Sequence, residues 1–152
     1  MNLLDDIRSH IEYSIANAQG NIFKYASELG YDLETFVEKY MESDFCNKDM
    51  DSEYSPFQNE LDVPCMEILT KEFSNKKINI PINTNIKYEY CAYYIGFVYR
   101  YLQILSGLSS KEIYKKIPFK KMTLNYFLDH YEYSDAIKEI CRCEKINYNK
   151  FV

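Results

Sequence analysis

The chain has 152 residues and a formal net charge of −5 at pH 7, and 47% of its residues are hydrophobic. A length of this order is typical of one domain and is enough to bury a core without a stabilising metal or disulfide. Five scattered cysteines and two histidines do not match the spacing of a zinc site, a redox CxxC pair or a disulfide framework. We therefore expect one soluble, cytoplasmic domain spanning residues 1–152, with no metal and no cofactor.

The first part of the chain has the periodicity of amphipathic helices. Apolar residues recur at helical spacing on an N-terminal helix, at Leu4, Ile7, Ile11, Ile15 and Ala18. We expect this helix to end at Gly20, because glycine often follows a helix terminus. A short second helix over 22–29 is then closed by Gly30. Asp32 is the expected N-cap of a third helix, which runs to about Ser43.

Helical periodicity is lost between residues 44 and 62, which we interpret as the one long loop inside the domain. Pro64 then lies in the first turn of another helix, which runs to about Phe73. Isoleucines alternate in the next segment, at positions 78, 80 and 82, so residues 76–83 are the only candidate for a strand. The pattern allows at most one short strand or hairpin near 76–83.

The central helix, expected over about 86–106 and ended by Gly107, carries apolar residues around most of its circumference. Its small and polar positions fall on one narrow stripe, which consists of Glu89, Ala92, Gly96, Arg100 and Gln103. Such a helix belongs in the middle of a bundle, and Ala92 and Gly96 would permit close approach of a neighbouring helix. A transmembrane span has a similar length, but Glu89, Arg100 and the tyrosines spread along the segment disfavour it.

Capping signals divide the rest of the chain into short helices. Ser109 and Glu112 have the spacing of a capping box at the start of a helix over 110–117. A further helix is expected around residues 119–127, and Ser134 is the expected cap of a terminal helix. The predicted fold class is therefore all-α, a single-domain helical bundle around the central helix.

Charge is distributed unevenly along the chain. Residues 1–75 contain five Lys and Arg against sixteen Asp and Glu, whereas residues 76–152 contain thirteen against seven. Acidic and aromatic residues gather in the expected loop, and this mixture suits docking onto a basic protein surface, although an ordinary solvated loop has a similar composition. The candidate partner-binding residues are Asp44, Asp49, Asp51, Glu53, Tyr54 and Phe57.

The sequence offers little that predicts catalysis, and we expect a protein that is not an enzyme. The best acid–base cluster surrounds His130, with Asp129, Glu132 and Asp135 nearby. A hydrogen-bonded structural histidine is the simpler interpretation of that cluster. The short lysine runs after residue 110 indicate a solvated face, because an acidic chain lacks the clustered positive charge that binding to nucleic acids requires. We expect no nucleic-acid partner and no membrane partner.

Two stretches of the chain resemble a known group of proteins. They are Tyr88-Glu89-Tyr90-Cys91-Ala92-Tyr93-Tyr94-Ile95-Gly96-Phe97-Val98-Tyr99-Arg100-Tyr101 and Ser106-Gly107-Leu108-Ser109-Ser110-Lys111-Glu112-Ile113, followed by Tyr126 and His130. They are similar to small bacterial proteins of gut Firmicutes, encoded beside ADP-ribosyltransferase-like toxins in loci that look like toxin–antitoxin modules. That family carries tryptophans in the central helix, where this chain has Cys91 and Phe97. The resemblance covers roughly residues 40–132 and implies a non-enzymatic partner that masks the active cleft of a toxin.

From these observations we expect a helical protein-binding module. The leading interpretation is an antitoxin or toxin-neutralising subunit that uses its acidic loop. The same surface would suit a phage or mobile-element protein that inhibits a host or defence enzyme. A small enzyme that uses His130 and nearby carboxylates is the third alternative.

Overall fold

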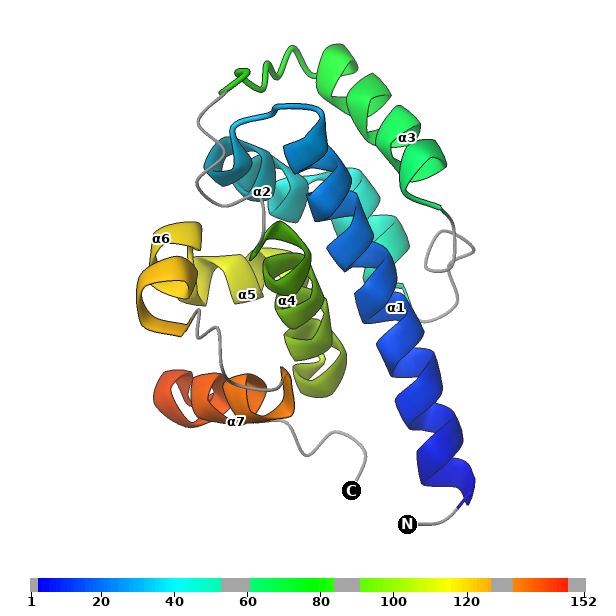
Figure 1. Ribbon diagram of the computed structural model, residues 1–152, viewed down its shortest axis with the longest axis vertical. Helices are drawn as coiled ribbons and strands as arrows, with labels where there is room; N and C mark the ends of the chain where they lie inside the picture. Colours follow the sequence, from blue (N-terminus) through cyan, green and yellow to red (C-terminus); the bar gives the residue numbers. More distant parts are fainter. Residues whose placement is uncertain (1–2, 53–60, 84–90, 127–132, 148–152) are drawn as a thin grey trace.

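Helices α1 and α4 pack against each other at the centre of the structure, and the other helices are arranged around them (Figure 1). The computed structural model describes residues 3–52, 61–83, 91–126 and 133–147. Helix α1 (Leu3–Glu28) has 26 residues, and α4 (Ala92–Ser106) has 15. At about 1.5 Å per residue α1 is roughly 39 Å long. Its N-terminal end projects beyond α3 and α4 (Figure 1).

Glycines allow α1 and α4 to approach closely. A Cβ atom on Gly96 would lie 2.8 Å from both the carbonyl oxygen of Gln19 and Cγ of Phe23, and one on Gly20 would lie 2.8 Å from the Tyr93 ring. The predicted close approach at Gly96 is thus confirmed. The predicted helix end at Gly20 is wrong, because α1 continues through this position and the glycine makes room for Tyr93 instead.

Burial of α4 confirms the predicted central helix over the part that the structure describes. Its narrow stripe is buried as well, since Ala92, Gly96, Arg100 and Gln103 all belong to the buried face. The helix ends at Gly107, which has a left-handed φ of 75° and donates its N–H to the carbonyl of Gln103. This is the glycine stop that the sequence indicates. Residues 86–90, the expected first turn, lie outside the described residues.

Local signals place the next two helices. Asp32 caps α2 (Leu33–Glu42), because its carboxylate accepts hydrogen bonds from both the N–H and the hydroxyl of Thr35. Helix α3 (Asp62–Asn75) begins close to the expected Pro64, which lies in its first turn. Both helices bury apolar faces against α1, as their sequence periodicity predicts.

The expected loop after Ser43 starts as a π-helix, η1 (Phe45–Met50), so the interpretation of 44–62 as entirely loop is wrong. Phe45, Cys46 and Met50 of η1 are buried. A π-helix bonds residue i to i+5 and occupies about one turn here. Its inward positions therefore do not follow the 3.6-residue spacing by which an α-helix is recognised in a sequence.

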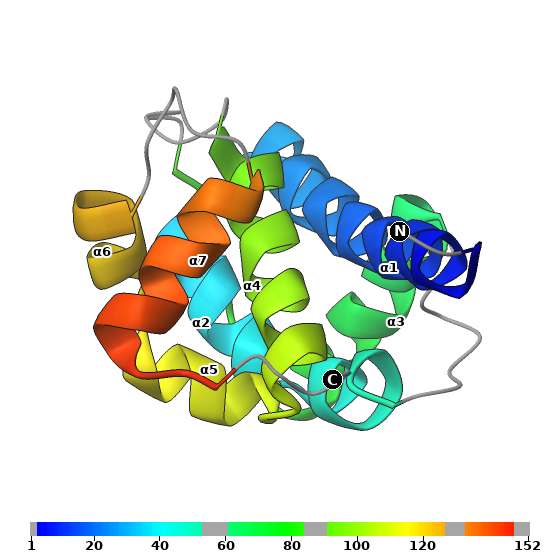
Figure 2. The same ribbon diagram turned by 90° about the horizontal axis from the view of Figure 1, so that it is seen from below.

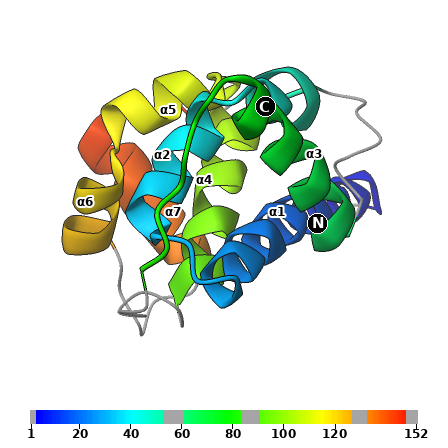
Figure 3. The ribbon, with the colours of Figure 1, turned by 90° about the horizontal axis from the view of Figure 1, so that it is seen from above.

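After α3 the chain runs across α2 as an extended segment (Figure 3). Tyr31 and Ile82 form an isolated antiparallel bridge, in which Asn83 N–H donates to the Gly30 carbonyl and Asp32 N–H to the Pro81 carbonyl, both at 2.8 Å. The short strand or hairpin expected near 76–83 is reduced to this bridge in the described part of the chain. Its partner is the tight turn between α1 and α2, which is too short to extend the pairing.

The C-terminal helices cover the side of α4 that faces away from α1 (Figure 2). They are α5 (Ser110–Lys116), α6 (Phe119–Lys121), η4 (Met122–Tyr126) and α7 (Tyr133–Glu144). The predicted capping box is present, since the Ser109 hydroxyl accepts from Glu112 N–H at 3.2 Å and donates to the Glu112 carboxylate. Glu144 holds α7 in place by accepting from Lys121 Nζ at 2.6 Å and from the Tyr126 hydroxyl at 2.7 Å.

The predicted fold class is confirmed. The described residues form an all-α single domain. Its core contains apolar side chains from every helix, and α1 contributes those that follow its first turns. Within those residues, no helix combines the length and the apolar character that a membrane crossing needs.

Candidate functional site

Arg100, on α4, is fully buried at the point where five elements meet. Its guanidinium donates to Gln19 of α1 through Nε (2.9 Å) and Nη2 (2.7 Å) and to Gln103 through Nη1 (3.0 Å). The remaining contacts are with Cys46, Asp51 and Ser110. We call these residues, together with Tyr40, the Arg100 network. Each guanidinium nitrogen has an acceptor, which is what a charge needs in a low-dielectric interior.

Asp51 supplies the negative charge of the Arg100 network. One of its carboxylate oxygens lies 2.6 Å from Arg100 Nη1 and also accepts from the Ser110 hydroxyl at 2.6 Å, and the other accepts from the Ser110 N–H at 2.8 Å. Asp51 thereby caps the first turn of α5 from 59 residues away. Only 9% of its side chain is exposed. The structure thus gives this predicted partner-binding residue an internal, structural position.

Two further groups of the network are kept neutral by burial. Burial raises the pKa of Cys46 to about 11, and burial also raises the pKa of Tyr40 well above its usual value. The Tyr40 hydroxyl donates to Gln19 at 2.9 Å, and Gln19 donates to the carbonyl of Gly96 at 2.9 Å. Cys46 is therefore a protonated thiol at neutral pH, with no activation as a nucleophile.

Asp44 and Asp49 lie at the two ends of η1, on the surface side. Asp44 is paired with Lys76 at 3.1 Å and with Lys48 at 3.8 Å, and the hydrogen bond from Lys76 lowers the pKa of Asp44. Partial burial, followed by the charge of Glu72, raises the pKa of Asp49. The remaining candidates, Glu53, Tyr54 and Phe57, lie outside the described residues. Of the three described candidates, the structure therefore leaves Asp44 and Asp49 on the surface.

Glu72 of α3 has a structural role beside the candidate residues that the sequence analysis missed. Its carboxylate accepts from the backbone N–H groups of Asp44 and Phe45, both at 2.8 Å, and pairs with Lys76 at 2.9 Å. It thus satisfies free donors at the start of η1 and fixes η1 on α3. No sequence spacing signals this contact, because the partners are 27 and 28 residues apart.

Apolar side chains are exposed at the start of α3, where the acidic segment 44–62 ends. Leu61 is 71% exposed and Val63 is 45% exposed. Asp62 lies between them, and Glu67 is exposed one turn after Val63. We call these four residues the α3 start surface. Large apolar groups bordered by carboxylates are typical of a surface that docks onto a basic protein.

A second charged surface lies between α2 and α5, where Glu42, Lys111, Tyr114 and Lys115 line a shallow depression. Burial, and then the nearby carboxylates of α2, raise the pKa of Tyr114 to about 12. Lysines of the C-terminal half thus lie beside carboxylates of the N-terminal half. Lys116 and Lys120 are exposed, in line with the expected solvated face.

The part of the chain that the structure describes shows no assembled metal site. No group of three or more His, Cys, Asp or Glu side chains suited to a metal ion occurs there. Cys46, Cys65, Cys91 and Cys141 are buried, and Cys143 is exposed. His130 and its neighbours Asp129 and Glu132 lie outside the described residues.

Comparisons with protein-family models, with curated proteins and with solved structures found no match to this chain.

Proposed function

We propose that this protein is a protein-binding domain that neutralises a positively charged partner. The observation that carries the proposal is the α3 start surface, in which the exposed side chains of Leu61 and Val63 are accompanied by the carboxylates of Asp62 and Glu67. Exposed apolar residues with a charged rim provide both the contact area and the electrostatic complementarity that an interface needs.

The position of this surface supports the proposal further. It overlaps the end of the acidic segment 44–62, and Glu72 ties the start of that segment to the same helix, α3. The resemblance to proteins of toxin–antitoxin-like loci suggests that the partner is a toxin, and an antitoxin of this kind needs no catalytic residue of its own. The Arg100 network then serves as the rigid support of η1 and α5 behind the acidic segment.

Capture of the partner from the native cells tests the proposal. Tagged protein carrying Leu61→Asp and Val63→Asp should lose the partner that the parent retains, because each change places a carboxylate at an apolar contact. Leu124→Asp is the matched control, since Leu124 is 79% exposed on η4. Mass spectrometry identifies the retained protein, and co-expression should show that the parent, but not the double variant, relieves its toxicity.

If the parent, the double variant and the control retained equal amounts of the partner, the interface would lie elsewhere on the protein. A retained partner whose effect on growth is unchanged by co-expression would contradict neutralisation while leaving binding intact.

A further inference from the structure

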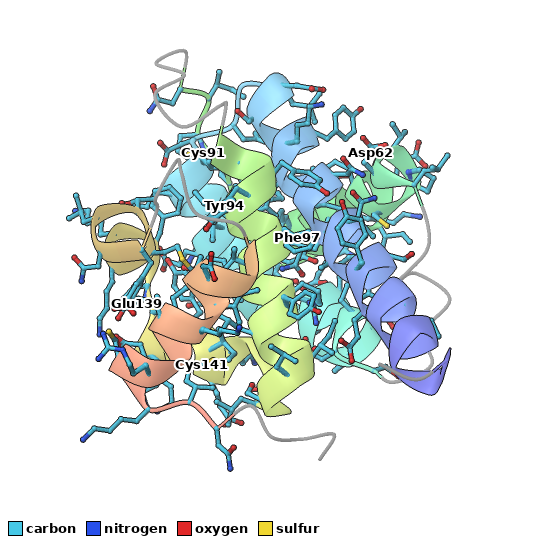
Figure 4. The ribbon with its side chains drawn as sticks, turned by 60° about the horizontal axis from the view of Figure 1, so that its bottom comes forward. Asp62, Cys91, Tyr94, Phe97, Glu139 and Cys141 are labelled. Atoms are coloured by element: carbon cyan, nitrogen blue, oxygen red, sulfur yellow. The ribbon has the colours of Figure 1, made fainter. Side chains whose placement is uncertain are left out.

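A cluster of aromatic rings lies where α1 and α4 meet, on the side of α4 that carries Phe97 (Figure 4). The Phe97 ring is 5.2 Å from the Tyr13 ring, 6.1 Å from Tyr93 and 5.8 Å from Tyr101, measured between centroids. Phe97 is buried, whereas Tyr13 is 50% exposed and Tyr93 and Tyr101 are half-buried. We call these four residues the tyrosine cluster. Its outer part is three tyrosine rings supported by a buried phenylalanine.

Two of the three tyrosine rings, those of Tyr93 and Tyr101, are held by hydrogen bonds to α1. Tyr93, Phe97 and Tyr101 follow one another at four-residue spacing, so they share one face of α4. The Tyr93 hydroxyl donates to Asn17, and the Tyr101 hydroxyl donates to Glu12 at 3.4 Å. These bonds to α1 restrict the rings before any partner arrives, which reduces the entropy lost on binding.

We propose that the tyrosine cluster is a docking surface for an arginine-bearing segment of a protein partner. A guanidinium is planar and weakly hydrated, so it stacks on tyrosine faces, and the Glu12 carboxylate beside Tyr101 adds the complementary charge. The net charge of −5 attracts a cationic protein and repels the phosphates of a nucleic acid. This inference rests on the proposed function only in that both require a positively charged partner.

Arginine recognition has a chemical signature that separates it from simple charge attraction. Lysine has the same charge, but its ammonium is strongly hydrated and offers no planar face for stacking. A surface that only attracts positive charge would bind arginine and lysine peptides equally. A surface that stacks guanidinium groups would prefer arginine.

Two helical peptides of identical sequence, except that one carries four arginines and the other four lysines, provide the probes. Titration of each into the protein with ¹³C-labelled tyrosine, followed by NMR, gives both affinity and the rings affected. We expect the arginine peptide to shift the Tyr13 and Tyr101 ring resonances and to bind about threefold more tightly than the lysine peptide. Tyr13→Ala should weaken binding of the arginine peptide by a similar factor.

Three controls make the outcome decisive. Tyr13→Phe retains the ring and should keep the binding, and Ile11→Ala removes a neighbouring side chain that is 55% exposed but not aromatic and should have no effect. The Leu61→Asp, Val63→Asp variant should also bind the peptide normally, so that failure here and failure of the proposed function are distinguishable. The proposal would be overturned if the arginine peptide did not bind, or if the two peptides bound with equal affinity. It would also be overturned if Tyr13→Ala bound the arginine peptide as tightly as the parent, or if single-stranded RNA bound more tightly at these rings.

Discussion

Arg100 shows how one buried charge can organise a helical core. Moving a guanidinium into the interior is costly, and the cost is offset only when its donors are satisfied and an opposite charge lies close by. Gln19 and Gln103 accept from the guanidinium, and Asp51 supplies the charge at 2.6 Å. Apolar residues of similar volume would pack there at less cost. We therefore infer that the Arg100 network favours one arrangement of η1, α4 and α5 over other ways of packing these elements.

Arg100→Met should destabilise the protein by about 3–5 kcal/mol, because Asp51 is then left nearly buried without a counter-charge. Urea denaturation monitored by circular dichroism measures the change. Adding Asp51→Asn to this variant should recover part of the loss, since the amide oxygen can still accept from Ser110 without carrying a charge. A midpoint equal to that of the parent for Arg100→Met alone would refute the structural role of the pair.

Asp32 gives a stability effect with a defined pH dependence. Hydrogen bonds from Asn83 and from Thr35 lower the pKa of Asp32 below its ordinary value of 3.8. Since the folded-state pKa is depressed, the carboxylate contributes its stability above the unfolded value and loses it as the pH falls through the folded value. Asp32→Ala should cost about 1 kcal/mol at pH 7, the usual magnitude for an N-cap.

Thermal melts of parent and variants between pH 7 and pH 2.5 test this prediction. The difference between the parent and Asp32→Ala should be constant down to about pH 4 and shrink below it. Asp32→Asn keeps a capping oxygen and has no charge, so its melting temperature should stay near that of the parent at pH 7. A difference that grows as the pH falls would contradict the assigned direction.

At the scale of elements, the structure depends on how closely α1 approaches α4. The two helices touch backbone to side chain at Gly96 and Gly20, and Gln19 Nε2 donates across the contact to the Gly96 carbonyl. Close packing of the two helices also brings Gln19 within hydrogen-bond distance of Arg100 and places the Tyr13 ring in edge contact with Phe97. Close packing of these helices is therefore the condition for both the Arg100 network and the tyrosine cluster.

Gly96→Ala should destabilise the protein by about 1–3 kcal/mol, although alanine is the better helix former by about 1 kcal/mol. Its Cβ would lie 2.8 Å from the Gln19 carbonyl oxygen, a backbone atom that can move only with α1. Ser14→Ala, at an exposed position of α1, is the control and should be neutral or slightly stabilising. A melting temperature that rises in both variants would show that the helices do not pack so closely.

At the scale of the whole molecule, folding brings the acidic and basic halves of the chain together. Asp51 pairs with Arg100 and Asp44 with Lys76, and carboxylates of α2 lie beside the lysines of α5. Part of the charge asymmetry between the two halves of the chain is therefore neutralised within the fold. The acidic groups that remain available to a partner include Asp49, within the acidic segment, and Glu67, which follows that segment on α3.

Asp49→Lys combined with Glu67→Lys should slow association with the basic partner and flatten its dependence on salt. Electrostatic steering weakens as the Debye length falls from about 10 Å at 0.1 M to about 3 Å at 1 M ionic strength. Asp51 must stay unchanged in this test, because its reversal would place a lysine against Arg100. Surface plasmon resonance from 50 to 500 mM salt measures the rates, with Asp135→Lys on α7 as the control; identical slopes for both variants would contradict steering by this surface.

The sequence by itself determined the fold class, the central helix and several helix ends. Asp32, Gly107 and the Ser109 capping box were identifiable because each acts on backbone groups within four residues. Apolar periodicity likewise depends on neighbours along one helix, so the buried faces of α2 and α4 could be predicted. Sequence patterns within one helix did not show that Gly20 makes room for the ring of Tyr93. The same patterns are found where a glycine ends a helix.

Only the tertiary structure decided the roles of the candidate site residues. Asp51 is a surface acid by sequence, yet it binds Arg100 49 positions away and Ser110 59 positions away. The exposure of Leu61 and Val63 and the contact of Tyr13 with Phe97 were equally absent from the local pattern. Such roles are set by which distant groups share a site after folding, because charge pairing and burial depend on separation in space rather than on separation along the chain.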